Sequence, residues 1–152
     1  MATRVTFDDI VKYFREQNLH FGIGASNTVS LNIKGEHEQY RVLIYYPWER
    51  EIIIAYANYP FRTPEEKRPE ILELVARVNW GLLFSVCECS PETGMLRFRS
   101  VMLTDEASFN SAQFTTMIST AVANAERYAI AFRAVLSGNA TVPQALSLVE
   151  NR

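Results

Sequence analysis

Residues 77–103 read RVNWGLLFSVCECSPETGMLRFRSVML, and this stretch decides the fold class of the chain. It begins with the end of a helix, because Gly81 is a residue type that commonly follows a last helical turn. Two apolar runs come next, separated by turn residues over 90–94, which is typical of a β-hairpin. A helix that leads directly into a hairpin predicts an α+β domain built on an antiparallel sheet.

The register of this hairpin decides which of its side chains face the core, since successive strand residues point to opposite faces. With Cys89 opposite Met95, Val86 lies beside Phe98. The expected core side chains are then Phe84, Val86, Leu96, Phe98 and Met102. Both thiols would share the opposite face with the arginines of the second strand. That face could bind an anion and hold a thiol of lowered pKa, or it could simply be a strand face kept in water by its arginines.

The rest of the chain supplies further helices and strands. Apolar residues recur with helical spacing over 6–18, over 69–80 after a short first turn, over 111–137 and, briefly, over 143–149. Strands are expected over 28–34, 36–46 and 51–58, preceded by a loop over 20–27 that has room for a short strand. The predicted order is α-β-β-β-α-β-β-α, in a single domain over residues 1–152, with the antiparallel sheet packed by helices.

The hairpin formed by 36–46 and 51–58 has two apolar faces. With Ile44 opposite Ile53 and Val42 opposite Ala55, one face belongs to the core. The other face carries Leu43, Tyr45, Ile52, Ile54 and Tyr56. Such a sheet must have both faces covered. Either a helix of the same chain covers the second face, or an exposed apolar patch of roughly 400 Å² marks an interface.

Trp48 lies in the turn of the same hairpin, where it either folds back on a strand or anchors a partner. We therefore expect a partner-binding surface that joins the second sheet face to this turn and to the arginines of the later hairpin. Its candidate residues are Leu43, Tyr45, Trp48, Ile52, Ile54, Tyr56, Arg97 and Arg99.

Composition and charge argue against several classes of partner. The net charge is −2 with scattered Lys and Arg, which disfavours nucleic acid. The longest apolar run, 51–57, is too short to cross a membrane. The segment Met1–Asp9 lacks the apolar core of a signal peptide, which predicts a cytoplasmic protein.

Chemistry-bearing motifs are also missing from the sequence. Cys87 and Cys89 are two residues apart, so a disulfide between them would close almost no loop, and two thiols are only half of a zinc site. His20 and His37 lie in separate loops. No nucleophile elbow, phosphate loop or metalloprotease motif is present. We expect no catalytic residue, metal or cofactor.

Residues 65–84, EEKRPEILELVARVNWGLLF, resemble the YbjN family, which includes cyanobacterial members of unknown function. The proline-started helix ends in Asn79 and leads into the hairpin, and the long Ala-rich helix matches as well. The resemblance covers roughly residues 6–136. It implies a fold like that of type III secretion chaperones, which commonly dimerise and hold other proteins, and a role in regulation, since some bacterial members are described as sensory transduction regulators.

The expected function is a cytoplasmic, non-catalytic protein-binding or regulatory module of chaperone-like fold. Its partner is a protein that the sequence does not identify, and self-association into a homodimer is among the expected interactions. The alternative is a small-molecule-binding protein or enzyme that uses a cavity between the sheet and the long helix.

Overall fold

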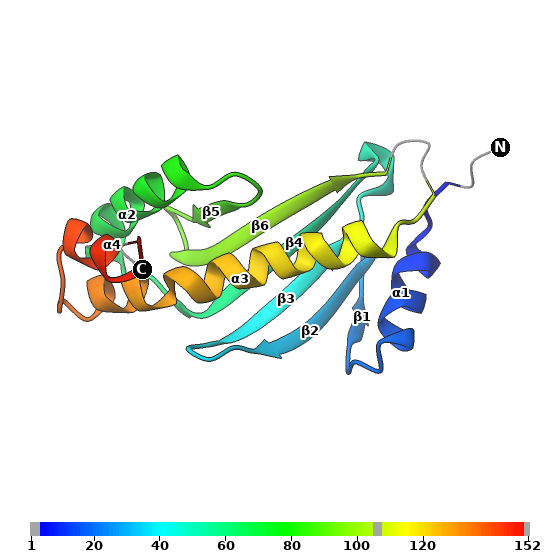
Figure 1. The fold of residues 1–152 in the computed structure, drawn as a ribbon, viewed down its shortest axis with the longest axis horizontal. Coiled ribbons are helices and arrows are strands. Elements are labelled where there is room, and N and C mark those ends of the chain that lie inside the picture. Colours follow the sequence, from blue (N-terminus) through cyan, green and yellow to red (C-terminus); the bar gives the residue numbers. More distant parts are fainter. Residues whose placement is uncertain (1–3, 105–107, 151–152) are drawn as a thin grey trace.

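The computed structural model, which describes residues 4–104 and 108–150, has a six-stranded antiparallel sheet with a long helix across one face (Figure 1). In chain order its elements are α1 (Phe7–Glu16), β1 (Gly22–Gly24), β2 (Thr28–Lys34), β3 (Gln39–Tyr45), β4 (Ile52–Arg62), α2 (Arg68–Gly81), β5 (Val86–Cys89), β6 (Met95–Leu103), α3 (Ser111–Leu136) and α4 (Val142–Glu150). Short 3-10 helices lie at Trp48–Arg50 and Glu65–Lys67. The strand order is β1-β2-β3-β4-β6-β5. The predicted α+β class is confirmed, with β1 as an added short strand.

Helix α3 carries most of the core. Its stripe of Phe114, Ala121, Ala125, Ala129 and Phe132 is fully buried against the sheet. The alanines let the helix backbone approach closely, and the hydroxyl of Tyr59 on β4 donates a hydrogen bond to the carbonyl oxygen of Ala125. At 1.5 Å per residue the helix is about 40 Å long, so it spans the sheet from end to end.

The other helices gather around α3 on the same side of the sheet. Thr6 and Asp9 form a capping box that starts α1, and Phe14 of this helix packs edge-on against Phe114 of α3. Helices α2 and α4 pack against the C-terminal half of α3, so that three helices lie together at one end of the molecule (Figure 1). As predicted, a short first turn precedes α2, and Pro69 lies in its first turn.

The first long hairpin differs in register from the prediction. Tyr45 pairs with Ile54 and Ile44 with Ala55, which is a shift of two residues. The connection is longer than expected because Trp48–Arg50 form a 3-10 turn and Glu51 adopts a left-handed conformation. Because successive strand residues alternate between the two faces, a shift of two residues leaves every side chain of this hairpin on its predicted face.

Strand β4 also runs further than predicted. We expected the strand to end at Asn58 because Pro60 cannot donate a hydrogen bond to a neighbouring strand. In the structure β4 continues to Arg62, and a bulge between Asn58 and Arg62 accommodates the proline.

The second hairpin corrects a prediction of larger consequence. Ser90 donates its N–H to the carbonyl oxygen of Met95, so Cys89 pairs with Leu96 rather than with Met95. This one-residue shift reverses the face of every β5 side chain. Cys87 is therefore buried beside Phe98, whereas the predicted core residues Phe84 and Val86 are exposed.

Asn79, at the end of α2, holds β5 in this orientation. Its amide nitrogen donates to the carbonyl oxygen of Cys87 at 2.9 Å, and its amide oxygen accepts from the Cys87 N–H at 2.8 Å. The side chain thus takes the place of a neighbouring strand at the edge of the sheet.

Candidate protein-binding surface

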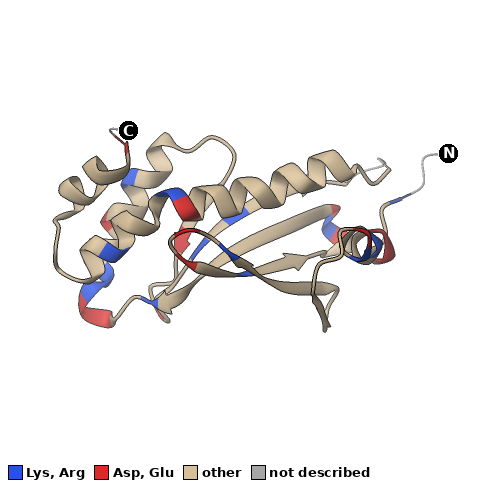
Figure 2. Ribbon diagram, turned by 60° about the horizontal axis from the view of Figure 1, so that its bottom comes forward, with Lys and Arg blue, Asp and Glu red and all other residues tan. Residues whose placement is uncertain are grey.

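The sheet face opposite α3 is the surface on which the predicted site residues meet. Helices α2, α3 and α4 all lie on the other side (Figure 2), and α1 packs on α3. Among residues 4–104 and 108–150, no helix packs on this face, which we call the outer face. The alternative that a helix of the same chain covers it therefore finds no support in the described part of the chain.

Strand pairing arranges the outer face in rows across β3, β4 and β6. Leu43 pairs with Tyr56 and Tyr56 with Arg99. In the next row Tyr45 pairs with Ile54, and Ile54 with Val101; a third row joins Ile52 to Leu103. Seven of the eight predicted residues thus lie on one face: Leu43, Tyr45, Ile52, Ile54, Tyr56, Arg97 and Arg99.

The apolar rows become more exposed toward β6. Ile54 in the centre is only 9% exposed, because its neighbours on both strands crowd it, whereas Val101 is 47% and Leu103 70% exposed. Neither Val101 nor Leu103 was among the predicted site residues. Alternation along β6 could have found them, since every second residue after Arg97 and Arg99 faces the same way.

The arginines of the outer face are already engaged within the chain. The guanidinium of Arg97 stacks 4.0 Å from the centre of the Tyr56 ring and donates to Glu88 at 3.0 Å. Arg99 lies 3.7 Å from the other oxygen of the same carboxylate. Because two arginines share one carboxylate, they form a polar border to the apolar rows that keeps a net positive charge.

The thiols do not share this border. Because β5 is reversed, Cys87 points into the core, and burial raises the pKa of its thiol well above the ordinary range. Burial also raises the pKa of Cys89, and its side chain lies against Thr63 instead of an arginine of β6. The hypothesis of an anion site with an activated thiol on this face was wrong.

Trp48 is the one candidate residue that does not lie on the outer face. It lies in the 3-10 turn between β3 and β4 and is half exposed. The guanidinium of Arg4 lies 6.0 Å from its ring centre and also pairs with Glu51 at 2.8 Å. Trp48 therefore extends the candidate surface only at the end of the sheet.

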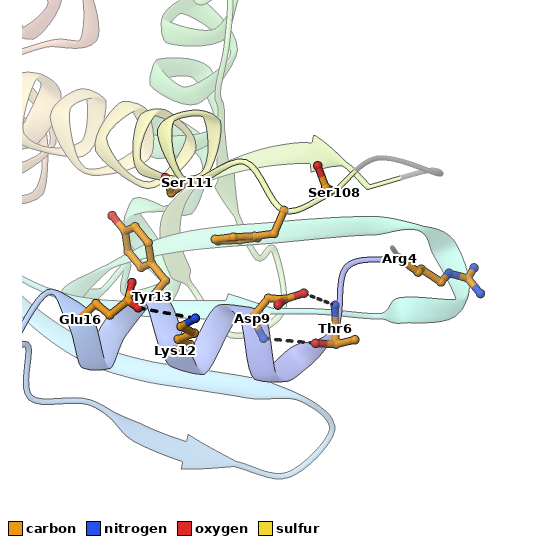
Figure 3. A pocket seen from close by; sticks show the side chains of 9 residues that line it. Arg4, Thr6, Asp9, Lys12, Tyr13, Glu16, Ser108 and Ser111 are labelled. Atoms are coloured by element: carbon orange, nitrogen blue, oxygen red, sulfur yellow. Dashed lines mark hydrogen bonds and ion pairs between the residues drawn. The ribbon is translucent and has the colours of Figure 1, made fainter. Parts of the chain in front are cut away.

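Two cavities bear on the small-molecule alternative. The first, of about 450 Å³, lies between α1 and the start of α3. Figure 3 shows that three of its charged side chains are engaged on α1: Asp9 in the cap of the helix, and Lys12 with Glu16. The second, of about 600 Å³, opens between β6 and α3 and is lined by uncharged residues. Among the described residues, neither cavity gathers unpaired charged side chains around one point.

Charge and metal ligands add no further site in the described part of the chain. Blue and red segments are interspersed around the ribbon in Figure 2. Within 4–104 and 108–150, no group of three His, Cys, Asp or Glu side chains is placed to hold a metal ion. None of the helices in those ranges has both the length and the hydropathy that crossing a bilayer requires.

One family model matches most of the chain. Residues 6–134 match the model of the YbjN family, whose description is "Putative bacterial sensory transduction regulator". Among solved structures, the crystal structure of YbjN from E. coli is similar with a TM-score of 0.61 and 10% identity, over 90% of this chain and 95% of that chain. The HopA1–SchA chaperone–effector complex gives a TM-score of 0.49 and 9% identity, over 80% of this chain and 91% of that chain. No curated protein matches the chain significantly.

Proposed function

Because this chain belongs to the YbjN family, as its sequence resemblance predicted, we propose that it is a non-catalytic protein-binding module that acts in regulation. Its binding surface is the outer face of the sheet, with Trp48 at the end. The partner is another protein or a second copy of the chain, and the cytoplasm is the proposed location.

The observation that carries this proposal is an apolar sheet face on which no described helix packs. A sheet with apolar side chains on both faces is stable in water when both faces are covered. Here α3 covers one of them, and Leu43, Tyr45, Ile52 and Tyr56 remain partly exposed on the other. Tyrosines and an arginine border suit a protein interface, where aromatic residues and Arg are enriched.

The cavities give less support to a small-molecule ligand or to catalysis. Binding sites for small molecules usually combine an apolar cavity with a few convergent polar groups. The charged side chains in the cavity beside α1 are committed to a helix cap and an ion pair. We therefore keep protein binding as the single proposed function.

The test is affinity capture with a variant of the outer face. Leu43→Asp and Ile52→Asp together place two charges in the apolar rows at partly exposed positions, which is gentler on the fold than a change at the nearly buried Ile54. We expect proteins retained by the wild type from an extract of its own cells to be lost with this double variant, while circular dichroism and thermal unfolding stay close to wild type.

The matched control is Leu148→Asp, which adds a charge at an exposed leucine of α4, far from the outer face. It should retain every partner. If the double variant retains the same partners as the control, the outer face is not the binding surface. The thermal unfolding curves of both variants show whether a loss of partners comes from the changed surface or from unfolding.

A further inference from the structure

Strand β6 is longer than its edge neighbour β5, and this leaves part of the sheet edge open. β5 pairs only with residues Leu96 to Arg99 of β6. From Ser100 to Leu103, β6 is paired with β4 on one side and with no described strand on the other. Figure 1 shows β6 continuing past β5 toward the start of α3.

The open edge presents unpaired backbone groups. In an antiparallel strand the N–H and C=O of one residue point to the same side, and successive residues alternate. Thr104 donates its N–H to Glu51 beside β4, whereas the carbonyl of Met95 accepts from Ser90 on the β5 side. The backbone groups of Val101 and Leu103 therefore point to the open side, where they can accept and donate hydrogen bonds.

A groove runs along this edge. It is the cavity of about 600 Å³ between β6 and α3, with Met102 and Met117 inside and Phe84 at its rim. Phe84 is 80% exposed, although it belongs to the largest apolar side chains of the chain. The hydroxyl of Ser100 lines the groove and is buried without a hydrogen-bond partner among the described residues. Thr116 and Thr120 complete the wall on α3, and none of the described residues that line the groove is charged.

We propose that this edge binds an extended, uncharged polypeptide segment of a partner protein, which adds as a strand to β6 in line with β5. The proposal rests on the protein-binding role proposed above but uses a different surface. An added strand would pair its backbone with Val101 and Leu103, as in the β-augmentation mode of peptide recognition.

The geometry of the open edge and the groove also indicates the length and the residue types of the bound segment. Four residues of β6 at about 3.4 Å each offer some 14 Å of edge, which suits a segment of four to five residues. Its side chains would alternate, one set entering the groove between Met102 and Met117, the other lying beside Val101 and Leu103 on the outer face. Because the described lining carries no charge and Met102 and Met117 make the middle of the groove apolar, an apolar residue at the central position and uncharged neighbours are expected.

The test is selection of binders from a displayed library of random heptapeptides on the whole protein. Selected peptides are then titrated by fluorescence anisotropy against two variants. Thr116→Arg fills the groove from an exposed position on α3, and Val101→Pro removes the N–H that faces the open side. Ser119→Arg, at an exposed position of the same helix that does not line the groove, is the matched control.

We expect enriched peptides to be uncharged with alternating apolar residues, and their affinity to fall at least tenfold in Thr116→Arg but not in Ser119→Arg. Amide exchange at Val101 and Leu103 should slow when peptide is bound. If Val101→Pro does not fold, Thr116→Arg decides alone.

Three results would overturn the proposal. They are the absence of enriched peptides, binding that Thr116→Arg leaves unchanged, and a dimer that Thr116→Arg converts to monomer, since the occupant is then a second copy. Peptides that lose affinity only in the Leu43→Asp and Ile52→Asp variant would support the outer face and count against the edge.

Discussion

Gly94 and Gly138 both adopt a left-handed backbone conformation, with φ of 75° and 77°, but only Gly94 is also confined. A Cβ atom at Gly94 would lie 2.1 Å from the carbonyl oxygen of Thr63, whereas one at Gly138 would meet nothing within 4 Å. Thr63 and Gly94 approach this closely because the Thr63 N–H donates to the Gly94 carbonyl at 2.8 Å. Gly94 thus fixes the second hairpin against the end of β4.

Alanine substitutions should separate these two effects. We expect Gly138→Ala to lower the free energy of unfolding by about 1–2 kcal/mol, the usual cost of a left-handed conformation. Gly94→Ala should cost more, about 3 kcal/mol or above, because the backbone of Thr63 must also move. Gly81→Ala is the control: it ends α2 with open space around it and should be neutral or stabilise by up to about 1 kcal/mol. Urea unfolding of the three variants measures their free energies of unfolding. Equal losses of this free energy in Gly94→Ala and Gly138→Ala would contradict the close contact at Gly94.

Buried acids make stability depend on pH at the alkaline end. Burial raises the pKa of Cys87 and of Tyr59 well above their ordinary values. In the unfolded chain a thiol ionises near pH 8.5 and a tyrosine near pH 10, roughly. The unfolded state therefore loses these protons at lower pH than the folded state, and the free energy of unfolding falls as pH rises above about 8.5.

We expect full stability from these groups below about pH 8.5 and a loss of up to about 1.4 kcal/mol per pH unit for each ionising group above it. Urea midpoints measured from pH 7 to pH 11 test this. Cys87→Ala should flatten the curve between about pH 8.5 and pH 10, although Cys89, whose pKa is also raised by burial, keeps part of the slope. A slope unchanged in Cys87→Ala would mean that the thiol is not buried in the folded state.

The two hairpins show which features of an element the sequence determines. Helix periods, the long Ala-rich stripe and the strand over Thr28–Lys34 follow from local patterns and were predicted within a few residues. The register of the two hairpins was not predicted correctly, because register depends on the conformation of the turn. A 3-10 turn and a left-handed Glu51 displaced the first hairpin by an even number of residues, which left the site prediction intact. A single hydrogen bond from Ser90 displaced the second by one residue and exchanged its faces.

Asn79 indicated a helix end in the sequence, but its hydrogen bonds to β5 could not be predicted from the sequence alone. It stands at the end of a helix, where an Asn often ends a helical segment. Its hydrogen bonds to Cys87 depend on how β5 comes back beside α2, which sequence spacing does not fix. Its residue type indicated a boundary, while its role in holding the sheet edge required the structure.

The corrected register of the second hairpin makes opposite predictions for its two phenylalanines. Phe98 is fully buried against Tyr59 and Tyr128, and Phe98→Ala should cost about 3–5 kcal/mol. Phe84 is exposed, and Phe84→Ala should change the free energy of unfolding by about 0.5 kcal/mol or less. Denaturant unfolding of both variants measures these two changes in the free energy of unfolding. A large loss for Phe84→Ala would restore the register first predicted, in which Phe84 belongs to the core.

At the scale of the whole molecule, the decisive feature is the placement of the helices. The alternating pattern of the central hairpin predicted two apolar sheet faces, and the structure places Leu43 and Tyr45 opposite the core as expected. The pattern could not say on which side each helix would pack, because an amphipathic stripe fits either face. Since α1 packs on α3, and α2 and α4 gather at the end of α3, no helix of the described residues covers the second face.

An available apolar face of this kind predicts self-association. The chain has a mass of 17.4 kDa, and we expect sedimentation velocity to detect a species of twice that mass whose share grows with protein concentration. A twofold dimer would place the same rows of both copies against each other. The Leu43→Asp and Ile52→Asp variant should then sediment as a monomer at all concentrations, because charges buried in an apolar interface lose their hydration.

The same measurement on Leu148→Asp, which leaves the outer face unchanged, should reproduce the wild-type dimer. Sodium chloride should not weaken the association, because apolar contacts carry it and the border of two arginines and one Glu88 leaves a positive charge on each copy that salt screens. A wild-type protein that sediments as a monomer at every concentration would remove self-association from the proposed functions and leave a different protein as the partner of the outer face. A dimer that persists in the double variant would place the contact between copies elsewhere, and the open edge of β6 would then be the first surface to test.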